Sequence, residues 1–111
     1  MSEALQILQK YWKHDSFRAP QEEIIQSVLS GNDTFALLPT GGGKSVCFQI
    51  PAMMLNGICL VISPLIALMK DQVQNLQSKN IKAIALTGGI SQDEVIDILD
   101  NCQFGNYKFL Y

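Results

Sequence analysis

The sequence is poor in residues that bind metals or cross-link a chain. It has one histidine and three cysteines, and Cys47, Cys59 and Cys102 stand far apart without a C-x-x-C pair. A structural zinc site needs four cysteine or histidine ligands, and a disulfide framework needs an even, patterned set of cysteines. The sequence therefore argues against both classes, and we expect three reduced, buried thiols.

Long apolar runs and an excess of positive charge are also lacking. No apolar run approaches the about 20 residues that cross a membrane, and residues 1–15 are polar and amphipathic, unlike a signal peptide. The net charge is −2 and the isoelectric point is about 5.1, which is not typical of a stand-alone nucleic-acid-binding domain. We expect a soluble, cytoplasmic protein with no membrane partner.

The sequence does contain the alternating predicted strands and helices that are typical of an α/β fold. Hydrophobic residues make up 48% of the chain and charged residues 16%, so 111 residues suffice for one packed domain. Strands are predicted at residues 34–38, 58–63, 81–86 and 107–111. Helices lie between them, and two more helices, at residues 3–12 and 20–30, precede the first strand. This order predicts a parallel sheet with helices on both faces.

Several helix ends are signalled by single residues. The helix after the first strand begins near Gly43 or Lys44, and Pro51 is expected to end or kink it. Ser63 and Pro64 are predicted to cap and open the next helix, and Ser91 with Glu94 forms a capping box for the last one.

Three glycines followed by lysine and serine stand where the first strand passes into a helix. In parallel sheets, ligands bind beyond the carboxyl ends of the strands. Backbone without Cβ atoms lets successive N–H groups surround one anion, and the helix N-terminus adds its positive dipole. We therefore expect a phosphate cradle made by Thr40, Gly41, Gly42, Gly43, Lys44 and Ser45.

The chemistry of this cradle is that of a nucleoside triphosphate site. Lys44 can reach the β- and γ-phosphates and is the candidate catalytic residue, while the Ser45 hydroxyl can bind Mg²⁺. ATP and Mg²⁺ are the expected cofactors. The pattern departs from G-x-x-x-x-G-K-[ST] at Leu38, where a glycine is usual. The simpler alternative is a glycine-rich turn with a solvated lysine.

Three blocks together resemble the first motor domain of RecQ-type DNA helicases, within helicase superfamily 2. They are FRAPQEEII at residues 17–25, LPTGGGKSVCFQIPA at 38–52 and VISPLIALMKDQVQNL at 61–76. The resemblance implies a partial RecA-like P-loop NTPase domain. It also implies ATP-dependent unwinding of DNA, in a bacterial cytoplasm or nucleoid or in a eukaryotic nucleus.

The resemblance also implies roles for single residues. Gln21 matches the glutamine that hydrogen-bonds the adenine edge, and Arg18 matches an arginine that packs near the base. His14 stands where the family carries an aromatic ring, and Ala19-Pro20 replaces its Pro-Gly. Without the resemblance, Arg18 and Gln21 would be read as the polar first turn of a helix, and His14 as an exposed histidine.

A DNA contact is expected at the strand-to-helix junction of the third block. The free N–H groups after Ser63 and Pro64, with Lys70 nearby, suit a DNA phosphate. The simpler alternative is helix capping alone. The family's DNA partners are single strands and duplex junctions.

The D-E-x-H block of the family is absent, and no predicted strand ends in Asp or Glu. Phosphoryl transfer to water needs such a carboxylate on the metal. We therefore expect residues 1–111 to be the N-terminal part of the first motor domain, truncated before that block. It should bind nucleotide without hydrolysing it, and it should self-associate through exposed apolar surface.

Two other hypotheses remain: another P-loop enzyme, such as a small-molecule kinase or GTPase, and a non-catalytic nucleotide-binding or interaction module.

Overall fold

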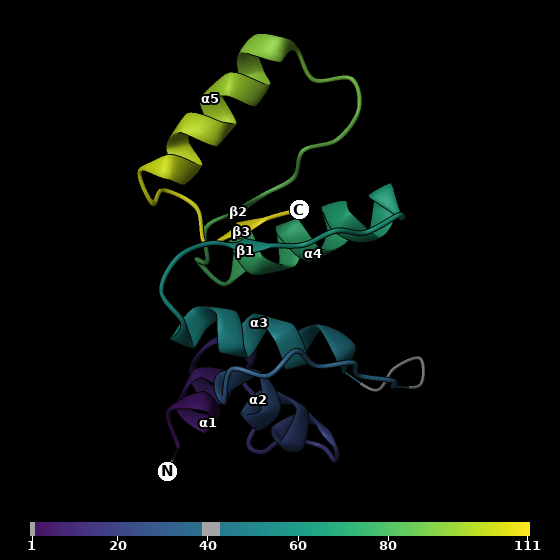
Figure 1. The fold of residues 1–111 in the computed structure, drawn as a ribbon, viewed down its shortest axis with the longest axis vertical. Helices are drawn as coiled ribbons and strands as arrows, with labels where there is room; N and C mark the ends of the chain where they lie inside the picture. Colours follow the sequence, from purple (N-terminus) through teal and green to yellow (C-terminus); the bar gives the residue numbers. More distant parts are fainter. Residues whose placement is uncertain (1, 39–42) are drawn as a thin grey trace. The chain divides into compact units, whose positions relative to one another are not determined.

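The computed structural model describes residues 2–38 and 43–111. They divide into two compact units, Met1–Asn56 and Gly57–Tyr111. The first unit is helical, and the second combines helices with a small sheet (Figure 1). Among the described residues, none of the helices has the length and apolar character that crossing a bilayer requires.

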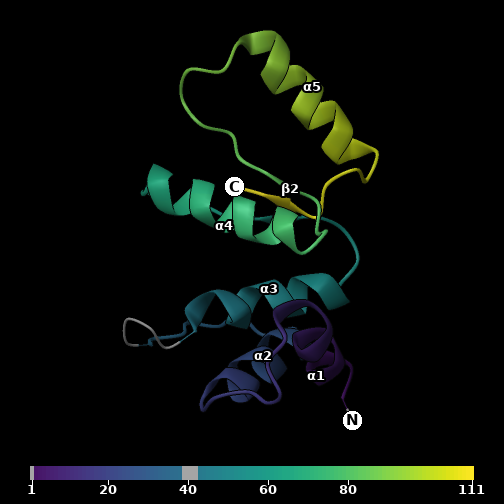
Figure 2. The same cartoon turned by 180° about the vertical axis from the view of Figure 1, so that it is seen from behind.

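The first unit is a cluster of helices around a small apolar core. It contains α1 (Glu3–Ile7), the π-helix η1 (Leu8–Trp12), α2 (Gln21–Leu29) and α3 (Lys44–Met54). Both α1 and α2 pack against α3 (Figure 2). The buried centre consists of Ala4, Leu8, Ile25 and Ile50. Apolar residues spaced three or four apart place these side chains on the inner face of each helix, which is why the predictions of the two leading helices were correct.

Glycine and proline mark the ends of α2 and α3 differently. Gly31 adopts a left-handed φ of 86° just after α2, the conformation that terminates helices. Pro51 was expected to end or kink the next helix, and α3 continues through it to Met54. Pro51 therefore does not end the helix, and the kink stays a prediction. Pro51 is among the fully buried side chains, so packing offsets the lost backbone hydrogen bond.

The predicted first strand was wrong. Residues 32–38 form neither helix nor strand, and Phe35 and Leu37 are 92% and 84% exposed while Leu38 is buried. The segment is mostly apolar, but a strand also needs a partner that accepts and donates backbone hydrogen bonds. None of the described backbone hydrogen bonds outside helices and strands involves residues 35–38.

The second unit contains the three remaining predicted strands as a parallel sheet. The strands β1 (Cys59–Leu60), β2 (Ala83–Ile84) and β3 (Phe109–Leu110) are ordered β1-β3-β2. Phe109 pairs with Cys59 on one side and with Ala83 on the other. Hydrogen bonds from Val61 N to Leu110 O (2.9 Å) and from Leu86 N to Tyr111 O (2.8 Å) extend the pairing beyond these cores. The central strand is fully apolar and buried, as a strand covered on both faces should be.

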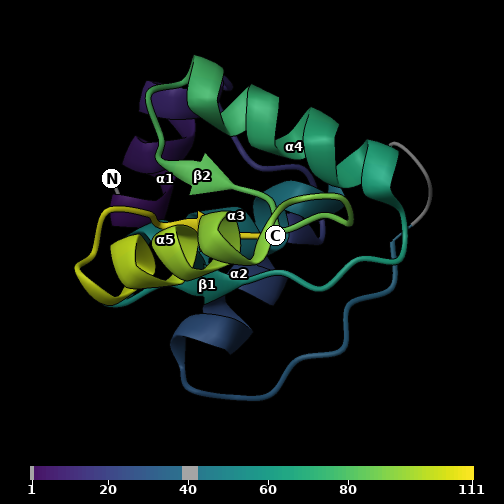
Figure 3. The same ribbon diagram turned by 90° about the horizontal axis from the view of Figure 1, so that it is seen from above.

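Two helices accompany this sheet, α4 (Ile66–Ser78) and α5 (Gln92–Gln103). They lie on opposite sides of the strands (Figures 1 and 3). α4 packs against β2 and buries Met69, Val73 and Leu76, whereas Leu65 and Leu68, also predicted to face inward, are 60% and 45% exposed. The prediction was wrong for these two because they precede or begin the helix, beyond the stretch that packs on the strand.

The capping box of α5 was predicted correctly, but its burial was not. Ser91 Oγ accepts a hydrogen bond from Glu94 N at 3.2 Å, which satisfies one of the free donors at the helix start. No described residue of α5 is buried, and Ile96 and Leu99 are 49% and 46% exposed. Amphipathic spacing thus predicted the helix without predicting what covers it.

Candidate nucleotide site

The candidate site is built on a tight turn that leads into α2. Gln21 N donates to Arg18 O at 2.7 Å, and Arg18 N donates in return to Gln21 Oε1 at 2.8 Å. The peptide bond between Ala19 and Pro20, inside this turn, is cis. The reciprocal bonds fix Gln21 as the first residue of α2, with only 4% of its surface exposed.

The other end of the Gln21 side chain reaches the start of α3. Gln21 Nε2 donates to Gly43 O at 3.1 Å, a contact between segments 22 residues apart in the chain. Gly43 is the N-cap of α3 and has φ 77° and ψ 39°. An ideal Cβ at Gly43 would lie 2.2 Å from Gln21 Nε2 and 3.0 Å from Arg18 Nη2. The structure therefore brings Arg18, Gln21 and Gly43 together, as the candidate site requires.

Cys47 also contacts the Gly43 carbonyl, although it was not predicted to belong to the site. Its Sγ donates to the same Gly43 carbonyl at 3.8 Å, as an i to i−4 side-chain bond within the first turns of α3. Burial raises the pKa of the Cys47 thiol, and a backbone hydrogen bond lowers it in part, so the thiol remains a protonated donor. The signal for this contact was a cysteine four residues after a helix cap, a residue that we expected only to be a buried thiol.

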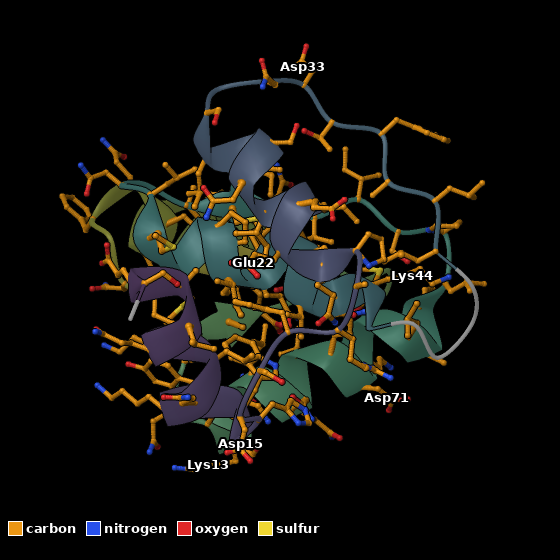
Figure 4. The ribbon with its side chains drawn as sticks, turned by 90° about the horizontal axis from the view of Figure 1, so that it is seen from below. Lys13, Asp15, Glu22, Asp33, Lys44 and Asp71 are labelled. Carbon is orange, nitrogen blue, oxygen red and sulfur yellow. The ribbon has the colours of Figure 1, made fainter. Side chains whose placement is uncertain are left out.

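The start of α3 has the character of an anion site. Gly43 supplies no side-chain cap, and the first turn of α3 holds no acidic residue, so its N–H groups and dipole are not neutralised from within the helix. Lys44 is exposed and Ser45 is half-buried in this first turn. Figure 4 shows Lys44 at this end of α3, in the unit that also carries α2 and Glu22. Thr40, Gly41 and Gly42, predicted to complete the cradle, lie outside the described residues.

The described residues offer Mg²⁺ little beyond one hydroxyl. Residues 2–38 and 43–111 contain no cluster of three or more histidine, cysteine, aspartate or glutamate side chains that could hold a metal ion. Magnesium commonly binds through one or two protein groups together with substrate phosphates and water. The contact between Mg²⁺ and the Ser45 hydroxyl therefore stays a prediction.

The three residues predicted to bind the base differ in their surroundings. A cavity of about 360 Å³ opens beside the Arg18 turn, with Phe17, Arg18, Glu22 and Glu23 among its lining residues. Gln21 does not line this cavity. Its two side-chain hydrogen bonds use one N–H group and one lone pair of Oε1, so a second N–H group and a second lone pair remain for other partners. His14 is exposed, in a turn that Gln9 Nε2 holds by donating to Asp15 O at 3.1 Å. The base contacts of Arg18, Gln21 and His14 stay predictions.

The predicted DNA-contact residues belong to the second unit. α4 begins at Ile66 with Leu65 as its N-cap, so the prediction that Ser63 caps the helix and Pro64 opens it was wrong. Ser63 Oγ instead accepts from Leu65 N at 3.3 Å and closes a short turn before the helix, an alternative common for serine. Leu65 makes no side-chain cap bond, and Pro64 and Lys70 are exposed.

Comparison with known proteins places these features in a family. Residues 18–107 match the family model described as DEAD/DEAH box helicase. The chain is 46% identical over 112 residues to the probable ATP-dependent DNA helicase RecS of Bacillus subtilis, covering 100% of this chain and 22% of that relative. It is 45% identical over 104 residues to the ATP-dependent DNA helicase RecQ of Synechocystis, covering 94% of this chain and 22% of that relative.

A plant relative is equally similar. The ATP-dependent DNA helicase Q-like 4B of Arabidopsis thaliana is 48% identical over 98 residues, which cover 86% of this chain and 8% of that protein. The chain thus spans 22% or less of the length of these curated relatives. The resemblance to RecQ-type helicases drawn from the three sequence blocks is confirmed, and since the family model matches most of its residues, the chain belongs to the DEAD/DEAH box helicase family.

Proposed function

We propose that the chain is the ATP-binding portion of an ATP-dependent DNA helicase, which couples ATP hydrolysis to translocation on and unwinding of DNA. The observation that carries the proposal is the uncapped start of α3, where Lys44 and Ser45 follow a left-handed Gly43 bound to Gln21. A helix N-terminus with a lysine in its first turn suits a triphosphate. The names of the relatives, which span far more sequence, support the choice of a DNA-unwinding motor.

Each residue of the site has a role in this proposal. The Lys44 ammonium neutralises the β- and γ-phosphates, and Thr40, Gly41, Gly42 and Gly43 supply backbone N–H groups. Ser45 gives its hydroxyl to Mg²⁺, which offsets phosphate charge when bound with ATP. Arg18 and Gln21 contact the base, and His14 stacks on it. Ser63, Pro64 and Lys70 contact DNA phosphates, of single strands and duplex junctions, in the compartment that holds the DNA.

We further propose that residues 1–111 correspond to the N-terminal part of the first motor domain. On its own this chain binds nucleotide without hydrolysing it, because no described cluster of carboxylates is available to grip the metal and orient water. The same observation favours the second candidate, a non-catalytic nucleotide-binding module.

Self-association of the chain stays a prediction; exposed apolar side chains such as Ile62, which is 98% exposed, support it.

Nucleotide titration of the chain tests this function. We expect ATP with Mg²⁺ to shift the amide NMR signals of residues at the start of α3, and GTP to displace it poorly because the Gln21 amide suits the adenine edge. Inorganic triphosphate serves as the base-free reference. Equal displacement by GTP would remove the base role of Gln21 and favour another P-loop enzyme, and an absence of any shift would refute nucleotide binding.

His14 offers a test of the base contact itself. Stacking of a base on an aromatic side chain is worth roughly 1–3 kcal/mol, and imidazole has less area than a benzene ring. We expect His14→Phe to tighten ATP binding a few-fold, measured by calorimetry, while leaving triphosphate binding unchanged. An unchanged ATP affinity would remove His14 from the site. Because His14 is exposed, the substitution should not disturb the core.

A further inference from the structure

The Gln21 side chain is a buried link between two main-chain segments. Its Oε1 accepts from Arg18 N at 2.8 Å, its Nε2 donates to Gly43 O at 3.1 Å, and 4% of the residue is exposed. A buried amide that binds main chain at both ends is held in one orientation, because either end would lose its partner if the group rotated. The described contacts of Gln21 therefore fix where the Gly43 carbonyl lies relative to the Arg18 turn.

The Gly43 carbonyl in turn governs the start of α3. Gly43 has the left-handed conformation that directs the chain into the helix, and its oxygen takes hydrogen bonds from both Gln21 Nε2 and Cys47 Sγ. One donor comes from α2 and the other from α3 itself, so α2 and α3 are joined at one atom. Lys44 and Ser45 follow directly, and their directions depend on the peptide that this carbonyl belongs to.

We infer that Gln21 is a positioning residue for the phosphate-binding end of α3, acting through the Gly43 carbonyl. The inference rests on the proposed nucleotide binding and deepens it. It differs from the base contact because it requires Gln21 even when the ligand carries no base. Affinity for inorganic triphosphate should therefore depend on Gln21 as well, and any additional loss for ATP measures the base contact.

The test uses Gln21→Met, which keeps the length of the side chain, adds no charge and removes both hydrogen bonds. We expect the affinity of the chain for Mg²⁺-triphosphate, measured by NMR titration, to fall by about 5- to 10-fold, the equivalent of one hydrogen bond, and the affinity for Mg²⁺-ATP to fall by at least as much. The matched control is Gln6→Met, an exposed position on α1 in the same unit, which should change neither affinity.

A second variant tests the donor itself. In Gln21→Glu an ionised carboxylate cannot donate to the Gly43 carbonyl, whereas the protonated acid can. Burial raises the pKa of a carboxyl group, so the ratio of variant to wild-type triphosphate affinity should recover as the pH falls from about 8 to about 5. Gln21→Met has no titratable group at this position and should show no such recovery, and a constant fluorescence of Trp12 over this pH range excludes a change of fold. This series also carries the test if Gln21→Met does not fold, judged by the fluorescence of Trp12.

The possible outcomes separate the inference from the proposed function. Loss of ATP affinity with unchanged triphosphate affinity would overturn the positioning role and leave the base contact and nucleotide binding intact. A pH-independent ratio for Gln21→Glu would also overturn it. Failure of the wild-type chain to bind either ligand would overturn the proposed function and the inference together. Parallel losses with recovery at low pH would support the positioning role.

Discussion

Replacing Lys44 with alanine is expected to weaken ATP binding by about 10- to 100-fold, the loss that corresponds to a charge-assisted hydrogen bond. Lys44 is the one ammonium group in α3, and the first turn of that helix contains no acidic residue to compensate for its charge. Its removal leaves the helix dipole and the backbone N–H groups as the remaining attraction for phosphate. Isothermal calorimetry with Mg²⁺-ATP measures the change.

Two comparisons make the Lys44 result specific. Lys82→Ala removes the same charge from an exposed position in the second unit, and it should leave ATP affinity within about twofold if only long-range attraction is lost. The loss for Lys44→Ala should be as large with inorganic triphosphate, because the ammonium group is assigned to the phosphates and not to the base. Equal effects of Lys44→Ala and Lys82→Ala would reduce the role of Lys44 to general electrostatics.

The local signals in the sequence were sufficient for most of the helices, including the start of α3. The glycine run followed by Lys44 predicted the beginning of α3 to within a residue, because glycine is favoured in left-handed caps. Ser91 and Glu94 likewise predicted the start of α5, because the hydrogen bond that caps the helix joins two residues within four positions of each other. Such features depend on near neighbours that the sequence itself specifies.

Features that depend on distant partners were predicted less well. The apolar character of residues 34–38 favours a strand, but a strand forms only where another backbone pairs with it, and Phe35 and Leu37 remain exposed. The hydrogen bond from Gln21 to Gly43 joins residues 22 apart in the chain. No short sequence pattern indicates that the Gln21 amide will donate to the Gly43 carbonyl. The family resemblance named the residue but assigned its bonds to adenine.

Gly43→Ala should destabilise the first unit by about 2–5 kcal/mol. A left-handed backbone costs a residue with Cβ roughly 1–2 kcal/mol, and the φ of Gly43 is 77°. The new methyl group would also lie 2.2 Å from Gln21 Nε2, which forces the amide away from its carbonyl and leaves a buried polar group without its partner, at about 1–3 kcal/mol. Urea unfolding followed by the fluorescence of Trp12, the single tryptophan, reports on this unit because Trp12 packs against its core.

The chain offers a matched control for the same substitution in the same unit. Gly31 also has a left-handed φ, 86°, but an added Cβ there meets no atom within 4 Å. Gly31→Ala should therefore cost only the backbone strain, about 1–2 kcal/mol, and the difference between the two variants measures the collision with Gln21. In a Gln21→Ala background the contact at 2.2 Å disappears and only the flexible end of Arg18 remains, at 3.0 Å, so Gly43→Ala should then cost little more than Gly31→Ala. Equal costs of the two glycine substitutions in the wild-type background would show that the Gln21 side chain does not occupy the space beside Gly43.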